Sequence, residues 1–302
     1  PRLPGWKYAH HALFPHFFDV EHCDPYVLRH LGSNEREALE ASRKAWYDVC
    51  CSVTSQDPGV VVLSSETFFR AGSSAQMARL GQILREVFDE IEIACYVRNP
   101  AELVLALFST QIQVGAEFEW PPPGLRKAVL KAYEQVGAEL IRVVKYSSES
   151  LVGGDIRKDF TSRFIGRSFD HRPPLNRVNQ SLSPEAMVVM EKYVVRHNAP
   201  INRAMPLRQQ LFRRVLKKVD QFLGNAQKSR LLPSAEASIL DSCTDLHWLE
   251  SNYDISWPRV PESQRDKPTR VVYGEKISLQ DICHFDLDRF TRIEKVMSLL
   301  GA

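Results

Sequence analysis

The chain has 302 residues, with 39 lysines and arginines against 37 aspartates and glutamates, and a formal net charge of +2. This near balance excludes a global electrostatic attraction to nucleic acid or to an anionic membrane, so any anion site must be local. Hydrophobic residues make up 44% of the chain, which is enough to bury a large core without a stabilising metal or disulfide. We therefore expect neither a nucleic-acid partner nor a metal.

The sequence shows no pattern of export or membrane insertion. No apolar stretch approaches the roughly 18 residues of a spanning helix, and no signal-peptide pattern follows Pro1. The six cysteines are scattered and none forms a Cys-x-x-Cys pair, which favours a reduced setting. A protein located in the cytoplasm, with no membrane span, is the simplest interpretation.

The first predicted elements alternate between helix and strand. A helix is predicted over about residues 34–53, followed by a strand at Val60–Leu63, whose continuous apolar run indicates that both faces are covered. Ser73 or Ser74 is predicted to cap the next helix, whose apolar residues recur at helical spacing. A second strand is predicted from Ile91 to Val97. This order is typical of an α/β fold with a parallel sheet flanked by helices.

The turn after the second strand is the most informative segment. Asn99 is predicted as an N-cap, Pro100 as the first helical residue and Glu102 as the reciprocal capping residue. Ligands of such sheets bind at the carboxyl ends of the strands, where Arg98 lies. Arg98 beside a helix N-terminus is predicted either to bind a phosphate or to pair with a carboxylate at the sheet edge.

A third strand is predicted at Leu140–Val144, after a proline-rich break at residues 120–124 and a helix at about 125–136. Lys145 follows at the carboxyl end of this strand, and a Gly153-Gly154-Asp155 loop comes soon after. These residues could contact a nucleotide, although turn chemistry alone also accounts for the glycines.

The rest of the chain is predicted to be mainly helical. Ser183 as N-cap and Pro184 as first residue predict a helix to about His197, and further helices are predicted at about 206–223, 234–253 and 278–300. The organisation predicted from these patterns is one α/β domain over 1–302, with a helical portion at about 176–257 and a C-terminal extension at 258–302.

The segment Arg203–Arg230 is strongly basic and contains Asp220 as its single acidic residue. Such a face could steer an anionic glycan acceptor, or it could be the solvated side of an amphipathic helix. Both interpretations stay open.

Three segments carry a resemblance to a known family: Val62-Leu63-Ser64-Ser65-Glu66, Tyr96-Val97-Arg98 and Arg177-Val178-Asn179-Gln180-Ser181-Leu182-Ser183-Pro184-Glu185-Ala186. They resemble the sulfotransferases that use 3'-phosphoadenosine 5'-phosphosulfate, and more narrowly the bacterial sulfotransferase-like proteins associated with surface glycans. The likeness extends over roughly residues 1–257. It implies a P-loop-like sheet, 3'-phosphoadenosine 5'-phosphosulfate as co-substrate, and transfer of a sulfuryl group to a hydroxyl of a carbohydrate or other small acceptor.

The resemblance also implies roles for individual residues. Arg98 would contact the 3'-phosphate of the donor together with a serine eight residues further on, but that position is Ala106, and Ser109 one helical turn later is the candidate substitute. Ser65 and Lys145 are further candidates for binding the donor. The lysine-bearing phosphosulfate loop of the family is not in this sequence, and we expect it upstream of Pro1.

Glu66 stands in the turn where the family places its catalytic base, so it is the first candidate to accept the proton of the acceptor hydroxyl. It could instead cap the next segment or pair with Arg70. His11, in a start that holds five of the nine histidines, is the second candidate, against zinc binding or a mobile polar terminus.

Two other functions compete with this prediction. A non-catalytic relative would keep the scaffold to bind a glycan or a protein, as the missing loop and Ala106 suggest. A kinase on a P-loop-like sheet would need a Walker lysine and a magnesium carboxylate.

Overall fold

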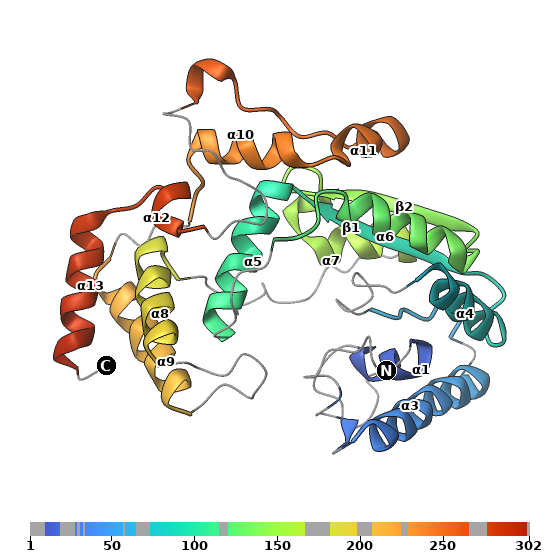
Figure 1. The fold of residues 1–302 in the computed structure, drawn as a ribbon. Helices are drawn as coiled ribbons and strands as arrows, with labels where there is room; N and C mark the ends of the chain where they lie inside the picture. Colours follow the sequence, from blue (N-terminus) through green and yellow to red (C-terminus); the bar gives the residue numbers. More distant parts are fainter. Residues whose placement is uncertain are drawn as a thin grey trace. The chain divides into compact units, whose positions relative to one another are not determined.

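The computed structural model describes residues 10–18, 28, 31–32, 34–56, 58–64, 73–114, 120–166, 182–197, 207–224, 229–265 and 277–300 (Figure 1). The chain divides into two compact units, which are described separately. Unit 1 comprises Pro1–Val97 and Leu125–Phe169, and unit 2 comprises Arg98–Gly124 and Asp170–Ala302.

Unit 1 combines helices with a small sheet. Its elements are η1 (His10–Leu13), α1 (Phe14–Phe17), α3 (Glu35–Gln56), α4 (Ser74–Arg85), β1 (Glu92–Arg98), α6 (Leu125–Tyr133), η4 (Glu134–Val136), β2 (Leu140–Tyr146), η5 (Val152–Gly154), α7 (Ile156–Phe160) and η6 (Thr161–Ile165). The described part of the chain is thus mainly helical with a two-stranded parallel sheet, which is compatible with an α/β fold.

The sheet confirms two of the three predicted strands. β1 and β2 match the strands predicted at Ile91–Val97 and Leu140–Val144. The strand predicted at Val60–Leu63 is wrong, because residues 60–64 are described without strand structure. Among the described residues the sheet pairs β1 with β2 alone, so this apolar run has no neighbouring strand to bond its backbone. Val60 is 57% exposed and Val62 38%, so the expected burial of both faces is wrong as well.

The core of unit 1 lies between its first helices and α4. Trp46 of α3 meets the ring of Phe17 edge-on at 5.1 Å between centroids, and both side chains are buried. Ser73 begins α4 with the predicted cap: its Oγ accepts a hydrogen bond from Gln76 N, and the side chain of Gln76 accepts one from Ser73 N. This reciprocal pair satisfies two backbone donors that a helix start leaves open.

Unit 2 is helical in its described residues. Its elements are α5 (Pro100–Val114), α8 (Pro184–Arg196), α9 (Leu207–Phe222), α10 (Pro233–Ser242), α11 (Leu246–Tyr253), η7 (Glu262–Gln264), α12 (Leu279–Ile282) and α13 (Leu287–Leu299). Proline is the first residue of α5, α8 and α10, where its missing N–H costs nothing.

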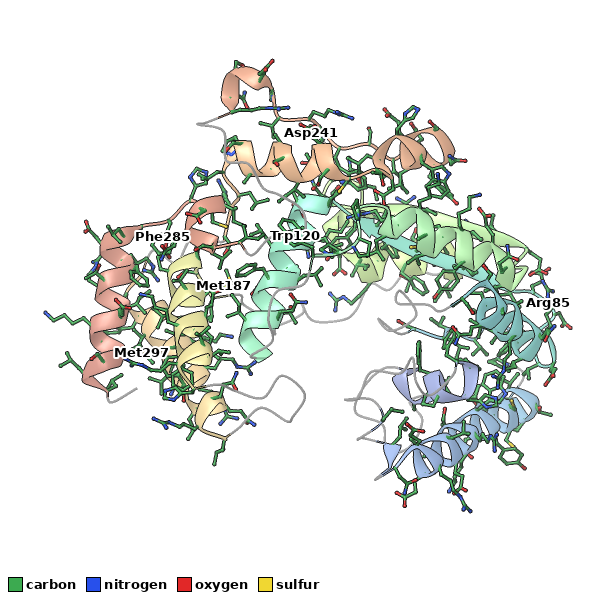
Figure 2. The ribbon with its side chains drawn as sticks, in the orientation of Figure 1. Arg85, Trp120, Met187, Asp241, Phe285 and Met297 are labelled. Carbon is green, nitrogen blue, oxygen red and sulfur yellow. The ribbon has the colours of Figure 1, made fainter. Side chains whose placement is uncertain are left out.

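The core of unit 2 surrounds α8, which packs against α5, α9, α12 and α13. Met187 of α8 and Met297 of α13, both labelled in Figure 2, are almost fully buried in it. Tyr193 stacks on Phe212 of α9 with 3.7 Å between ring centroids. The predicted helices over 184–197 and 206–223 are therefore confirmed, and their apolar stripes form the contact between them.

A buried ionic network joins α8, α9 and α13. Arg289 of α13 is 4% exposed, and its Nη2 donates to Asp220 Oδ1 at 2.6 Å and to the Asp220 carbonyl oxygen at 2.7 Å. Its Nε lies 3.5 Å from Oε2 of Glu185. Asp220 also accepts from the Oγ and the N–H of Ser183, at 2.7 and 2.9 Å. Glu185 in turn accepts from the N–H of Asp286, the N-cap of α13.

This network explains the Ser183-Pro184-Glu185 segment in physical terms. Ser183 accepts from Ala186 N as the predicted N-cap while its own hydroxyl and N–H donate to Asp220. Glu185, one residue after Pro184, faces Arg289. The segment starts α8 and at the same time fixes α8 to α9 and α13.

Two long predicted helices are each broken in the structure. The helix predicted over 234–253 divides into α10 and α11, with Cys243 extended between them. The helix predicted over 278–300 divides into α12 and α13, because Cys283 is extended and forms an antiparallel bridge with Leu231. Backbone pairing with a distant residue overrides the local helical preference at Cys283.

We predict that Asp220→Ala lowers the free energy of unfolding by about 3–5 kcal/mol, because it removes the main carboxylate of a buried guanidinium. Asp241 is the matched control, since it contacts Arg259 and Arg265 at 3.6 and 3.4 Å while 44% of its side chain is exposed. Asp241→Ala should cost about 0–1 kcal/mol. Urea unfolding of both variants measures the difference, and equal losses would contradict the structural role of Asp220.

Candidate functional site

The site that the structure describes best lies at the start of α5 in unit 2. Arg98 ends β1, and its Nε donates to Oε2 of Glu102 at 3.1 Å, four residues on. The side chain of Asn99 accepts from Ala101 N at 2.8 Å, and its carbonyl oxygen accepts from Leu103 N. Pro100 is the first helical residue, as predicted. As a reciprocal cap, the Glu102 side chain is predicted to accept a hydrogen bond from the backbone N–H of Asn99. In the structure its carboxylate accepts from Arg98 instead.

The contact of Arg98 with Glu102 is the carboxylate pairing that the sequence left open. The pair is only partly shielded, since 33% of the Arg98 side chain and 53% of the Glu102 side chain are exposed. Exposed pairs at this spacing are weak, with about 0.3–0.5 kcal/mol in isolated helices. The guanidinium is therefore held near the N-terminus of a 15-residue helix by a partner that an external anion can displace.

A second carboxylate belongs to the same cluster. Glu236 lies in the first turn of α10, which packs against α5. Burial, and next the negative charge of Glu102, raise the pKa of Glu236 above its ordinary value. A buried carboxyl group with a raised pKa near a second carboxylate is a candidate for moving a proton. We call Arg98, Glu102 and Glu236 the α5 cluster.

Ser109 lies further along α5 and is 6% exposed. It follows Pro100, the first residue of α5, by nine residues, so a helix places it about 14 Å along the axis from the α5 N-terminus. Ala106, at the position where the family has serine, lies one turn earlier, and its carbonyl oxygen accepts from Thr110. The structure thus brings Arg98 together with Glu102 rather than with Ser109.

Lys145 belongs to unit 1, where it lies half-buried near the carboxyl end of β2. The turn beyond it is fixed by Asp159, which is 0% exposed. Asp159 accepts from Tyr96 Oη at 2.8 Å, from Val152 N at 2.9 Å and from Arg163 Nε at 2.7 Å. This carboxylate ties β1 to the loop that follows β2.

The contact between Tyr96 and Asp159 shifts the pKa values of both side chains. Burial first, and then the hydrogen bond to Asp159, raise the pKa of Tyr96. Burial opposes ionisation of Asp159, but the hydrogen bonds from Arg163, Val152 and Tyr96 outweigh it and lower its pKa. Tyr96 is thus a neutral donor to an ionised carboxylate. The predicted Gly153-Gly154 loop has positive φ at both glycines, as turn chemistry requires.

The other predicted site residues are not placed. Ser65 and Glu66 lie outside the described residues, and the structure describes the backbone of His11 within η1 but not its side chain. His16, from the same histidine-rich start, is a core contact: its ring stacks on Trp46 with 6.1 Å between centroids. Burial, followed by the charges of Arg79 and Arg43, lowers its pKa.

The described residues contain neither a cluster that could hold a metal nor a helix that could span a membrane. Within them, no group of three or more His, Cys, Asp or Glu side chains could hold a metal ion. None of the helices in the part of the chain that the structure describes is long and apolar enough to cross a membrane.

Comparison with known proteins returned no match, either to a protein-family model, to a curated protein or to a solved structure.

Glu236 is the residue of this cluster that sequence reasoning missed. It lies 134 residues after Glu102, and no motif links the two helices in the sequence. Its one local signal is a position in the first turn after Pro233, which describes many structural glutamates equally well. Packing of α10 on α5 is what brings its carboxyl group near Glu102.

We predict that Glu236→Gln stabilises the protein near pH 7 and that this gain disappears below about pH 4.5. A carboxyl with a raised pKa binds more protons in the folded than in the unfolded state, so wild-type stability falls as the pH rises above the ordinary value of 4.5. Urea unfolding between pH 4 and pH 7 measures the slope. Glu102→Gln should reduce the change of unfolding free energy with pH. If Glu236→Gln showed the same pH dependence as the wild type, the raised pKa of Glu236 would be contradicted.

Proposed function

We propose that the protein is a sulfotransferase that moves a sulfuryl group from 3'-phosphoadenosine 5'-phosphosulfate to a hydroxyl, on a carbohydrate or another small acceptor. The observation that carries the proposal is Arg98 at the junction of β1 and α5. It places a guanidinium and a helix N-terminus together, which is the chemistry that a phosphate requires. A P-loop-like sulfotransferase fold belongs to the same proposal.

In the proposed reaction the oxygen of the acceptor hydroxyl attacks sulfur in line. The bond between sulfur and the phosphate oxygen of the donor breaks, a bond from sulfur to the acceptor oxygen forms, and the leaving group is 3'-phosphoadenosine 5'-phosphate. The hydroxyl proton passes to a general base, for which Glu66 is the first candidate, His11 the second and Glu236 a further one. Arg98 would hold the 3'-phosphate, with Ser109, Ser65 and Lys145 as further candidates for donor contacts.

In this proposal the donor phosphate competes with Glu102 for the Arg98 guanidinium. The two contact at 3.1 Å, and a phosphate that takes the guanidinium replaces one carboxylate with a more highly charged anion. Glu102 would also repel that phosphate from close range. In this proposal Glu102 therefore opposes donor binding, and Arg98 supports it.

We predict opposite effects of Arg98→Ala and Glu102→Gln on binding of 3'-phosphoadenosine 5'-phosphate, measured by isothermal titration. Arg98→Ala should weaken binding by roughly tenfold or more, because a charge-assisted contact to phosphate is lost. Glu102→Gln should tighten binding by roughly two- to fivefold, because the competing carboxylate is removed.

Arg36 and Glu40 on α3 provide the matched control, since they form an exposed pair with the same spacing at 3.0 Å. Arg36→Ala and Glu40→Gln should bind the nucleotide as the wild type does. Equal affinity of the wild type and Arg98→Ala would refute the proposed phosphate contact.

Transfer itself is tested with labelled donor and a panel of glycan acceptors. Nucleotide binding without transfer by the full-length protein would favour the non-catalytic alternative. Phosphoryl transfer that depends on magnesium would favour the kinase.

A further inference from the structure

The outward face of α9 carries an apolar row within a basic surface. Leu207, Leu211, Val215 and Phe222 are 71%, 50%, 36% and 88% exposed. Their spacing of four, four and seven residues places them in one row along the helix, and Lys218 falls in the gap of this row. We call these five residues the α9 row.

The opposite face of α9 is buried, so the orientation of the row is fixed. Phe212, Leu216 and Val219 lie in the core of unit 2, and α9 packs against α8 and α13, with α8 beside it in Figure 1. Arg289 bonds the last turn of α9 through Asp220. The α9 row is therefore held outward on a helix that needs no ordering before it meets a partner.

All charged residues of α9 other than Asp220 are positive. Within the predicted basic segment Arg203–Arg230, the residues on α9 are Arg208, Arg213, Arg214, Lys217 and Lys218. Asp220 is the single acidic residue of α9, and it is buried against Arg289. Arg203 and Lys228 lie outside the described residues. The outward face of α9 thus combines cations with apolar side chains and presents no carboxylate.

We infer that this face binds the surface of an anionic lipid bilayer, with the apolar row entering the interface and the basic residues meeting the headgroups. Apolar residues flanked by lysine and arginine on a surface helix have the chemistry of interfacial membrane binding. This inference is independent of the proposed sulfotransferase activity.

Two details favour a bilayer over other anionic partners. A polyanionic glycan would engage the cations but has no use for an exposed row that includes Phe222 and Leu207. An acidic partner helix would bury Lys218 in the middle of its interface with α9, and lysine is disfavoured in the core of an interface. At a bilayer, Lys218 can place its stem along the apolar layer and its ammonium group among the headgroups.

Co-sedimentation of the full chain with lipid vesicles tests this inference. Vesicles of phosphatidylcholine with 30% phosphatidylglycerol, roughly the anionic content that such segments respond to, should bind the wild type. Vesicles of phosphatidylcholine alone should bind it at least about tenfold more weakly, and added salt should weaken binding to the anionic vesicles.

Two double variants separate the apolar and the ionic parts. The first double variant carries Leu211→Asp and Phe222→Asp, and the second carries Arg214→Glu and Lys218→Glu. Each should reduce binding to anionic vesicles roughly tenfold or more. Both pairs are exposed, so the fold should persist, and circular dichroism with thermal melting checks this.

Arg292→Glu with Lys295→Glu is the matched control for charge, because both residues are exposed on α13 and the change in net charge is the same. Leu299→Asp is the control for the apolar change, since Leu299 is 78% exposed. Both controls should bind like the wild type. The inference is overturned if anionic vesicles do not bind the wild type, or if the Leu211 and Phe222 variant binds as tightly as the wild type, which would indicate a surface for polyanions.

Discussion

The buried charge of Arg289 is the constraint on which unit 2 depends. A guanidinium cannot stay in an apolar interior without matching carboxylates and acceptors. Asp220 supplies one carboxylate from the last turn of α9, and Glu185 supplies the other from the first turn of α8. Because these partners come from different helices, the charge can be satisfied in one mutual arrangement of α8, α9 and α13. The same pairing buries the only acidic residue of α9 and leaves the outward face of that helix without a carboxylate.

Unit 1 also contains a buried charge that several elements must satisfy, but this charge is negative. Its buried charge is the carboxylate of Asp159, and the donors come from β1, from the turn after β2 and from η6. Left-handed backbone at Gly153 and Gly154 lets the chain turn so that Val152 N reaches Asp159. These glycines therefore have a sufficient structural reason, and a nucleotide is not needed to explain them.

The sequence predicted local structure well because helix starts depend on neighbouring residues. Ser73 accepts from Gln76 N, and Ser183, which precedes Pro184, accepts from Ala186 N, so each cap satisfies a backbone donor within one turn. Pairing between distant residues is invisible in such patterns. Val60–Leu63 has the composition of a strand but no partner in the described sheet. Cys283 leaves its helix to form an antiparallel bridge with Leu231, in which Leu232 N donates to the Ile282 carbonyl and His284 N to the Arg230 carbonyl. Of the candidate site, Arg98 was predictable from its turn, whereas Glu236 required the packing of α10 on α5.

Arg98 and Arg289 show how burial separates an exchangeable contact from a permanent one. Both lie near the start of a helix and face a carboxylate, so they look alike in the sequence. The Arg289 side chain is 5% exposed, and loss of its partner would strand a charge in the core. The Arg98 side chain is 33% exposed and pairs with a glutamate that water also solvates. The pairing of Arg98 with Glu102 is therefore weak enough for a doubly charged phosphate to replace the carboxylate. An anion-binding arginine needs this property.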